Sequence, residues 1–529
     1  MSITSLIFFI FVAACLVIYY LVPKKAQWIV LLVASLVFYA LSSTVLTLFM
    51  LASTLLIYFG AIKIQNFGDE FKAKKKDLEK AERKLLKTKT KKKQKNVLTL
   101  IVILNLAILA VLKYSNFLGG IGNSIISLFT HEDVIPTFNF ILPLGISYYT
   151  LMAISYIVDV YRGTIKAEKN PCRLLLFVCY FPHIMEGPFD RYNSLDSQFR
   201  EPHPFDYDAV KNGGVLMLFG LFKKLVIADR IGLVASGIFD QADTMSGTSI
   251  AVAIVAYTIQ LYCDFSGCID VVAGISEMFG IKVAQNFSQP FFSRSINEFW
   301  RRWHITLGLW LKEYVFYPVS LSGSFKKVNT FAKKHIKSEY FVQMIPAAYA
   351  LFFVWFCNGI WHGASIKYIF YGLYYYFLMM LGEFTKPLTD KLCAALKINR
   401  EAKLYHLFQM VRTFIIVNIG MLIFRSATFK ESTDLFLQMF SSVNFTELLS
   451  RSIIPRISYR DYLVLIVGIL IVFVIGLLKE KGHDIRKELD TKPFILRWII
   501  YLFLIFALLV TGMYGSNAGG DAAAIYAQF

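Results

Sequence analysis

The histidine at position 362 has the setting that most strongly suggests chemistry. It follows the apolar run 341–360, which is long enough to cross a bilayer because about 20 residues at 1.5 Å each span the hydrocarbon. A titratable ring at membrane depth is costly unless it faces protein or water, so it predicts a functional residue that exchanges protons near neutral pH. Gly359 and Gly363 flank it and allow close approach of a backbone or a substrate. The alternative is a histidine anchored at the interface beside Trp361.

A second histidine, His304, follows Trp303 within the stretch 293–318. Aromatic residues recur in this stretch at helical spacings of four and seven, and arginine and lysine lie between them. The pattern predicts an amphipathic helix in the membrane interface. On this evidence alone, His304 is an ordinary interfacial histidine.

Carboxylates in an apolar setting form the third candidate group. Asp264, Ser266 and Asp270 follow the clean apolar run 250–263, with a glycine between them. They predict a broken helix that lines a cavity, because charged groups at membrane depth face protein or water. The alternative is ordinary capping of a helix end by Asp and Ser.

Composition indicates which elements must position these residues. Of 529 residues 56% are hydrophobic, and the mean hydropathy is +0.55, far above a soluble domain. We therefore predict an all-α polytopic membrane protein with about eleven transmembrane helices plus re-entrant and amphipathic helices. The segment 172–187 contains Pro182, His183 and Glu186, which are too polar for a lipid-facing span, so we predict a buried re-entrant or interfacial piece there.

The excess of positive charge, +19 overall, lies mainly in loops between the apolar runs. Segment 63–95 alone contains 14 Lys/Arg against 5 Asp/Glu. Because basic short loops stay in the cytoplasm, this segment predicts a cytoplasmic loop, with the N- and C-termini outside a cell membrane. The same charges fit contact with membrane lipid better than binding of nucleic acid.

Metal chemistry finds little support in the sequence. The seven cysteines lie mostly in apolar runs and form no Cys-x-x-Cys pair. A metal site built on His304 and His362 would need further ligands, and no carboxylate or thiolate lies at a suitable spacing in the sequence. We therefore expect no metal and no bound cofactor.

Two motifs carry a resemblance to a known family. The stretch Arg301–Leu307, Arg-Arg-Trp-His-Ile-Thr-Leu, and the stretch Asn358–Gly363, Asn-Gly-Ile-Trp-His-Gly, resemble the signature motifs of the membrane-bound O-acyltransferase family. More closely, the chain resembles its bacterial branch, which contains the membrane subunit of alginate O-acetylase and the D-alanyl transfer protein of teichoic acid synthesis. Phe181-Pro182-His183, Tyr262–Gly267 and Asn286-Phe287 are similar to other blocks of that branch.

The resemblance implies one membrane domain over residues 1–529, with a signature-bearing core at 143–376 and a ring of helices around a central funnel. It implies that His362 is the general base on an acceptor hydroxyl or the acyl-accepting nucleophile. It further implies that His304 positions a thioester or tunes His362, and that Asn358 polarises a carbonyl or orients the ring. The alternatives are packing of His304 against Trp300 and Trp303, and a helix-end amide at Asn358. The expected supporting residues are Trp303, Trp361, Asp264 and Ser266.

The same resemblance implies the substrates and partners. The donor is an acyl thioester of coenzyme A or of an acyl carrier protein, and the acyl group, acetyl in the first instance, goes to a cell-surface or exported polysaccharide. The expected partners are an extracytoplasmic acyltransferase or proteins of polysaccharide synthesis. The first alternative is D-alanyl transfer to teichoic acid from a carrier protein. The second is a polysaccharide or lipid transporter in which the two histidines relay protons.

Overall fold

A computed structural model of the chain describes residues 3–42, 44–130, 134–138, 140, 145–449 and 457–514. Within these residues the chain forms helices and connecting loops and no strand, with an isolated pairing of Phe287 with Trp303. The prediction of an all-α protein is therefore confirmed. The predicted outer position of the C-terminus falls on residues 515–529, which lie outside the described ranges.

The chain divides into two compact units, Met1–Gly213 with Ile275–Ala284, and Gly214–Gly274 with Gln285–Phe529. The single membrane domain expected over residues 1–529 stays a prediction. The first unit contains α1 Leu6–Leu21, η1 Lys24–Ala26, α2 Gln27–Ser42, α3 Thr44–Lys74, α4 Lys80–Leu109, η2 Ala110–Tyr114, α5 Ser115–Thr130, α6 Ile146–Arg162, α7 Pro171–Cys179, α8 Phe181–Glu186 and α9 Tyr192–Arg200.

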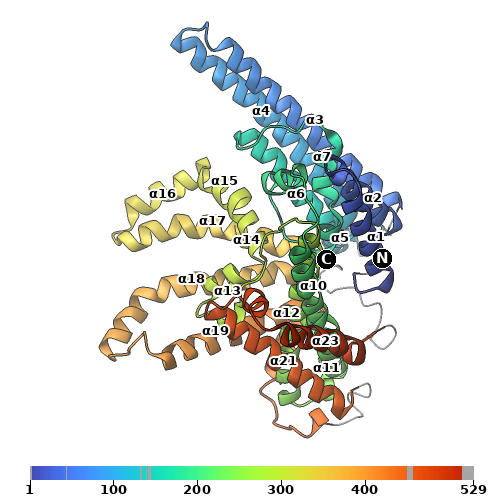
Figure 1. The fold of residues 1–529 in the computed structure, drawn as a ribbon. Coiled ribbons are helices and arrows are strands. Elements are labelled where there is room, and N and C mark those ends of the chain that lie inside the picture. The colour runs from blue at the N-terminus through green and yellow to red at the C-terminus, as the bar shows by residue number, and fades with distance from the viewer. Residues whose placement is uncertain are drawn as a thin grey trace. The chain divides into compact units, whose positions relative to one another are not determined.

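The second unit holds most of two long helices, α10 and α12, and the helices that follow them (Figure 1). Its elements are α10 Tyr207–Leu221, η3 Phe222–Ala228, α11 Asp229–Phe239, η4 Ala242–Thr244, α12 Gly247–Met278, η5 Pro290–Phe292, α13 Ile296–Arg302, α14 Ile305–Leu311, η6 Lys312–Phe316, α15 Tyr317–Ser320, α16 Gly323–His335, α17 Glu339–His362, α18 Ile366–Ala395, α19 Lys403–Arg425, α20 Phe429–Gln438, η7 Glu447–Leu449, α21 Tyr459–Glu480, α22 Ile485–Asp490 and α23 Phe494–Thr511.

Eight helices in the described residues are long and apolar enough to cross a membrane, by length and composition. The sequence predicts about eleven, and the difference lies in α1, α6, the α10–η3–α11 segment and α18, which are shorter, interrupted or less apolar than the eight. Several of the eight leave large apolar side chains uncovered by protein, as at Leu463 of α21 and Leu509 of α23. Such apolar faces suit contact with lipid, because the backbone N–H and C=O groups of a helix bond to one another and need no water.

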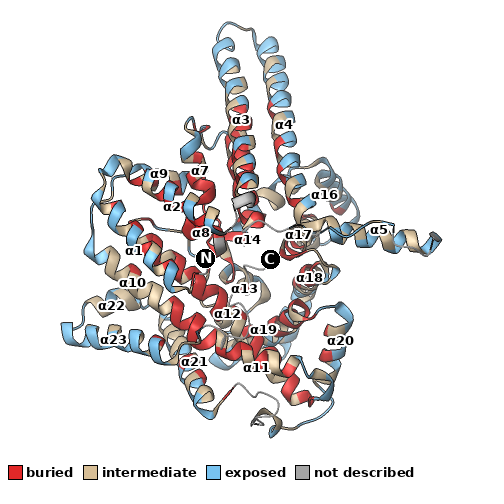
Figure 2. Ribbon diagram, turned by 90° about the vertical axis from the view of Figure 1, so that its right-hand side faces the viewer, coloured by how far each residue is buried: buried red, intermediate tan, exposed pale blue. Residues whose placement is uncertain are grey.

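The basic segment 63–95 forms the ends of two helices and the turn between them. Helix α3 ends at Lys74 and α4 begins at Lys80, and the two lie side by side (Figure 1). Near Gly60 they are in close contact, because a Cβ at this position would meet Ile101 at 2.7 Å. Farther along the hairpin the lysines are exposed (Figure 2). The predicted loop is therefore largely a helical hairpin whose outer part is charged.

The segment 172–187 forms two short helices, α7 and α8, which meet at Tyr180. Neither is long enough to cross a membrane, in agreement with the predicted non-spanning segment. His183 is buried on α8, and its Nε2 lies 3.2 Å from Oδ2 of the buried Asp190. His183, one of the residues that argued against a lipid-facing span here, thus has a carboxylate partner inside the first unit.

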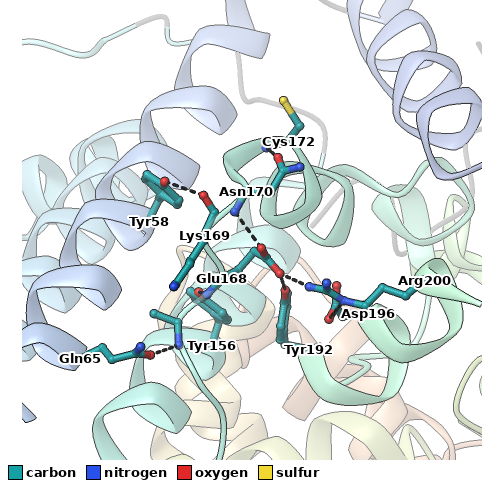
Figure 3. A network of polar contacts seen from close by, with 11 residues as sticks. Tyr58, Gln65, Tyr156, Glu168, Lys169, Asn170, Cys172, Tyr192, Asp196 and Arg200 are labelled. Atoms are coloured by element: carbon teal, nitrogen blue, oxygen red, sulfur yellow. Dashed lines mark hydrogen bonds and ion pairs between the residues drawn. The ribbon is translucent and has the colours of Figure 1, made fainter. Parts of the chain in front are cut away.

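Glu168 organises a polar network beside the α3–α4 hairpin (Figure 3). Its carboxylate accepts hydrogen bonds from Tyr192 Oη at 2.8 Å and from the backbone N–H of Asn170 at 2.7 Å, and it pairs with Arg200. The Glu168 N–H in turn donates to Tyr156 Oη at 2.8 Å. Burial raises the pKa of Glu168, but these hydrogen bonds and the Arg200 charge outweigh burial and leave the pKa below its ordinary value.

This balance predicts how stability depends on pH. A carboxylate with a depressed pKa stabilises the fold above its unfolded pKa of about 4.3, and loses that contribution as the pH falls through its folded pKa. Glu168→Gln should cost about 1.5–3 kcal/mol at pH 7, since it weakens hydrogen bonds to a charged group. The difference in melting temperature from wild type should shrink as the pH falls from 7 to 4. Glu201→Gln, at an exposed site, is the control, and a difference that stays constant with pH would contradict the account.

Candidate active site

Helix α17 places His362 at its last residue, with its side chain almost fully buried at 2% exposure. The helix packs against α18 through glycines. A Cβ at Gly359 would collide with the carbonyl oxygen of Tyr368, and one at Gly372 would collide with the carbonyl oxygen of Trp355. The absence of side chains at both positions lets the two backbones approach closely, which fixes the depth and direction of the α17 end.

The His362 ring lies among aromatic rings. The centroid of Trp361 is 4.9 Å away, that of Phe424 5.3 Å and that of Tyr371 5.5 Å, the last two edge-on. Asn358 lies four residues earlier on α17, so helical periodicity places it on the same face as His362. The Asn358 side chain is buried, and its Oδ1 has no hydrogen-bond partner among the described residues. A buried acceptor of this kind is suited to a donor on a bound molecule.

The stretch 293–318 is not one amphipathic helix, so that prediction was wrong. It consists of α13, α14, η6 and α15, with a break between α13 and α14 at Trp303 and His304, where His304 has the left-handed φ of 48°. The break arises because residues 286–288 pair with this backbone. Ser288 N–H donates to the Arg302 carbonyl at 2.9 Å, and Ile305 N–H donates to the Asn286 carbonyl at 3.0 Å.

The break turns both residues into the protein interior. Trp303 is 1% exposed and His304 is 4% exposed, so both side chains contact protein, whereas the predicted amphipathic helix would have left them on its surface. Trp303 stacks on Phe299 at 5.4 Å and meets the edge of Phe287 at 5.2 Å. These contacts hold the break between α13 and α14 in place.

Asn286 fixes the tautomer of His304. Its Oδ1 accepts hydrogen bonds from the Thr306 N–H at 3.1 Å and from Thr306 Oγ1 at 2.8 Å, which identifies that atom as the oxygen. Because an amide oxygen only accepts, His304 Nδ1, 3.1 Å away, must carry its proton and donate it. Burial lowers the pKa of His304 to about 3, so the ring is neutral and its Nε2 is the unprotonated nitrogen, which can accept a hydrogen bond.

Trp361 brings the two histidines to one place. The centroid of its indole lies 5.7 Å from the His304 ring and 4.9 Å from the His362 ring. The ring of Phe265 packs edge-on against the ring of His304, with the two centroids 4.8 Å apart. The structure therefore places five predicted residues, His304, His362, Asn358, Trp361 and Trp303, in one buried region of the second unit. No group of three or more His, Cys, Asp or Glu in the described residues has metal-site geometry.

Asp264 and Ser266 contact a neighbouring pair of lysines. The predicted broken helix is wrong, since α12 runs without interruption through both residues. Their charges and dipoles are satisfied from the π-helical turn η3, where Lys224 Nζ lies 2.7 Å from Asp264 Oδ1 and Lys223 Nζ lies 3.0 Å from Ser266 Oγ. Between them, Phe265 contacts His304. These residues thus hold α12, and with it Phe265, in position.

This buried charge cluster predicts a large loss of stability on substitution. Lys224→Met leaves Asp264 and Asp229, 1% and 9% exposed, without their shared cation, and should cost about 3–5 kcal/mol. Lys223→Met is the matched control, because its partner Asp270 is 23% exposed and keeps access to water. Melting temperatures in detergent measure both. A Lys223 effect equal to or larger than the Lys224 effect would contradict the argument.

Sequence reasoning missed the residues that hold the histidines. Asn286 lies in a motif block to which the sequence assigns no role, and the two lysines of η3, Lys223 and Lys224, interrupt an apolar run without suggesting a partner. For Asn286 a signal was present, because it is the polar member of a block that the family resemblance had already singled out. For the lysines the spacing to Asp264 and Asp270 carried no helical or strand period, so only the fold brings them together.

The family model and the individual relatives that match this chain indicate the same protein family. The model of the "MBOAT, membrane-bound O-acyltransferase family" matches residues 168–333, which include His304 but end before His362. A "Probable alginate O-acetylase AlgI" of Pseudomonas aeruginosa is 32% identical over 438 residues, covering 83% of this chain and 74% of that protein.

Two relatives with other named activities also match. A peptidoglycan O-acetyltransferase of Helicobacter pylori is 30% identical over 379 residues, covering 67% of this chain and 63% of that protein. A teichoic acid D-alanyltransferase of Bacillus subtilis is 31% identical over 258 residues, covering 48% of this chain and 62% of that protein. The chain, an O-acyltransferase with several membrane-spanning helices, therefore belongs to the membrane-bound O-acyltransferase family.

Proposed function

We propose that this enzyme moves an acetyl group from a cytoplasmic thioester, through the protein, to a hydroxyl of a cell-surface or exported polysaccharide. The observation that carries the proposal is the convergence of two buried histidines on one indole, that of Trp361. Acetyl is preferred because the relatives that match over most of this chain are named for O-acetylation of alginate and of peptidoglycan.

In the proposed reaction, His362 takes the proton of the acceptor hydroxyl as its oxygen attacks the thioester carbonyl. The new C–O bond forms as the C–S bond breaks, and the thiolate leaves and receives the proton from His362. In a covalent route the imidazole of His362 would itself accept the acyl group first. General base catalysis of this kind contributes about 10²–10⁴-fold to the rate.

His304 is assigned a positioning role toward the thioester. A ring with a pKa of about 3 is a weak base at neutral pH, but its neutral Nε2 can accept a hydrogen bond from an N–H or O–H group of the thioester substrate. Trp361, Tyr371 and Phe424 surround His362 with apolar surface. Exclusion of water there favours transfer to the sugar over hydrolysis of the thioester.

The test uses sealed, right-side-out membrane vesicles from cells that make the protein and from cells that lack it. The vesicles are loaded with acetyl-labelled acetyl-coenzyme A and supplied outside with polysaccharide acceptors. Label that reaches an acceptor as an ester only in vesicles with the protein supports the proposal. Label that stays on the donor in both preparations, with a donor pool shown to be intact, would contradict it.

The second candidate is D-alanyl transfer to teichoic acid, favoured by the match to the Bacillus subtilis protein over 48% of this chain. It predicts ester-linked D-alanine on the surface polymer and dependence on an acyl carrier protein. Mass spectrometry of surface glycans from the same cells separates the two, because acetyl and D-alanyl esters differ in mass. The proposed partner, an extracytoplasmic acyltransferase or a protein of polysaccharide synthesis, would be found by crosslinking in those cells.

A further inference from the structure

We propose that a basic cleft formed by residues of the first unit binds a ligand with an anionic phosphate ester group. The cleft has a volume of about 1230 Å³ and is lined by α3, α4, the end of α6, the loop 163–169 and α9. It is large enough for a ligand of nucleotide size, since small-molecule sites occupy about 300–1,000 Å³. The Glu168 network forms part of its wall (Figure 3).

Positive charge dominates the lining, with eight Lys and Arg against three Asp and Glu. The three carboxylates already have cationic partners. Glu168 and Asp196 both pair with Arg200, and Asp69 lies 3.1 Å from Lys72 Nζ. The acidic residues of the cleft therefore neutralise Arg200 and Lys72, and Arg162 lies 3.9 Å from Asp159 outside the lining, which leaves only lysines uncompensated.

Five lysines of the lining have no ion-pair partner within the described residues. They come from the α3–α4 turn, α4 and the loop 163–169, and no described carboxylate lies within 4.0 Å of the ammonium groups of Lys75, Lys87, Lys91, Lys166 and Lys169. Like charges brought to one concavity repel one another, which raises the affinity of that concavity for an anion. This is the feature that separates the cleft from a solvated charged surface.

A phosphate ester fits this arrangement better than a carboxylate. Lysine ammonium groups are compact point charges that bind phosphate oxygens, and several phosphate oxygens can meet lysines from different directions. The planar bidentate fork that suits carboxylates is provided by arginine, and Arg200 is already occupied. The ligand can come from solution, as a nucleotide, or from the membrane, as the headgroup of an anionic phospholipid.

The experiment uses the full chain purified in a neutral detergent, with two probes. Equilibrium dialysis measures binding of ADP, and native mass spectrometry measures retention of phosphatidylglycerol against phosphatidylcholine. The lining variant is Lys87→Glu/Lys91→Glu. The matched control is Lys89→Glu/Lys92→Glu, which makes the same charge change on the same helix at exposed residues outside the lining.

Binding of ADP or selective retention of phosphatidylglycerol, weakened at least about tenfold by the lining variant and less than twofold by the control, supports the site. The probe that binds identifies the source, solution or membrane. Binding should also weaken with added salt, because exposed charges are screened. Absence of binding to both probes, or equal weakening by the two variants, would overturn the proposal. Equal melting temperatures of the two variants ensure that the comparison concerns binding and not folding.

Discussion

His362→Ala should lower acyl transfer by about 10²–10⁴-fold, the contribution expected of a general base, while the protein remains folded and present in the membrane. The loss should appear in the chemical step, since the ring is proposed to take the hydroxyl proton. It is measured as ester-linked acyl groups on surface glycans by mass spectrometry, with protein abundance followed by immunoblot. Because the imidazole contacts Trp361, Tyr371 and Phe424, melting temperature must be followed as well.

The matched control is His335→Ala, which removes an exposed histidine at the end of α16. It should leave ester formation within twofold of wild type, as expected for a surface substitution outside a site. Unchanged esters in the His362 variant, with normal protein abundance, would remove the central assignment. The failure of this prediction leaves the phosphate-ester cleft untouched, because that proposal rests on residues of the first unit.

His304→Asn should lower activity by about 10²-fold or more and leave the fold intact. Asparagine tolerates the left-handed backbone that His304 adopts, so the variant removes the ring without imposing a new backbone. Loss of activity with a melting temperature near that of wild type supports a positioning role in the reaction. Retained activity would assign His304 to packing against Phe265 and Trp361.

Asn286→Asp tests the role of His304 through the pH dependence of activity, which a purely structural role would not change. A carboxylate at this position would stabilise the protonated imidazole and raise the pKa of His304 from about 3. Activity should then fall as the pH decreases toward the new pKa, because the protonated ring loses its Nε2 lone pair. Wild type should show no titration of His304 between pH 5 and 8. Identical pH profiles for the two proteins would contradict the assigned tautomer.

Hydropathy was sufficient to place the long helices. The predicted run 341–360 and the observed α17, Glu339–His362, differ by two residues at each end, because a long apolar segment has few alternatives to a helix. The residue pair at the centre of the site, His304 and His362, was also accessible, but only through the motifs around them. Their spacing along the chain contains no geometric information.

The local sequence pattern did not predict where the helices break. The sequence suggested a helix through His304 and a break near Asp264, and the structure has the reverse. In the first case, backbone groups 17 residues away at 286–288 compete for the hydrogen bonds of the helix. In the second, lysines about 40 residues earlier supply the charge that lets α12 continue. Both outcomes depend on contacts between segments, which periodicity does not report.

The backbone at His304 also has a consequence for the evolution of this enzyme. A non-glycine residue in the left-handed region costs about 1–3 kcal/mol. The buried imidazole offsets this cost by packing against Phe265 and Trp361, and its removal in His304→Gly would leave a cavity that costs about 2–5 kcal/mol. Laboratory selection for heat resistance alone should therefore keep the histidine, so that stability and catalysis constrain codon 304 in the same direction.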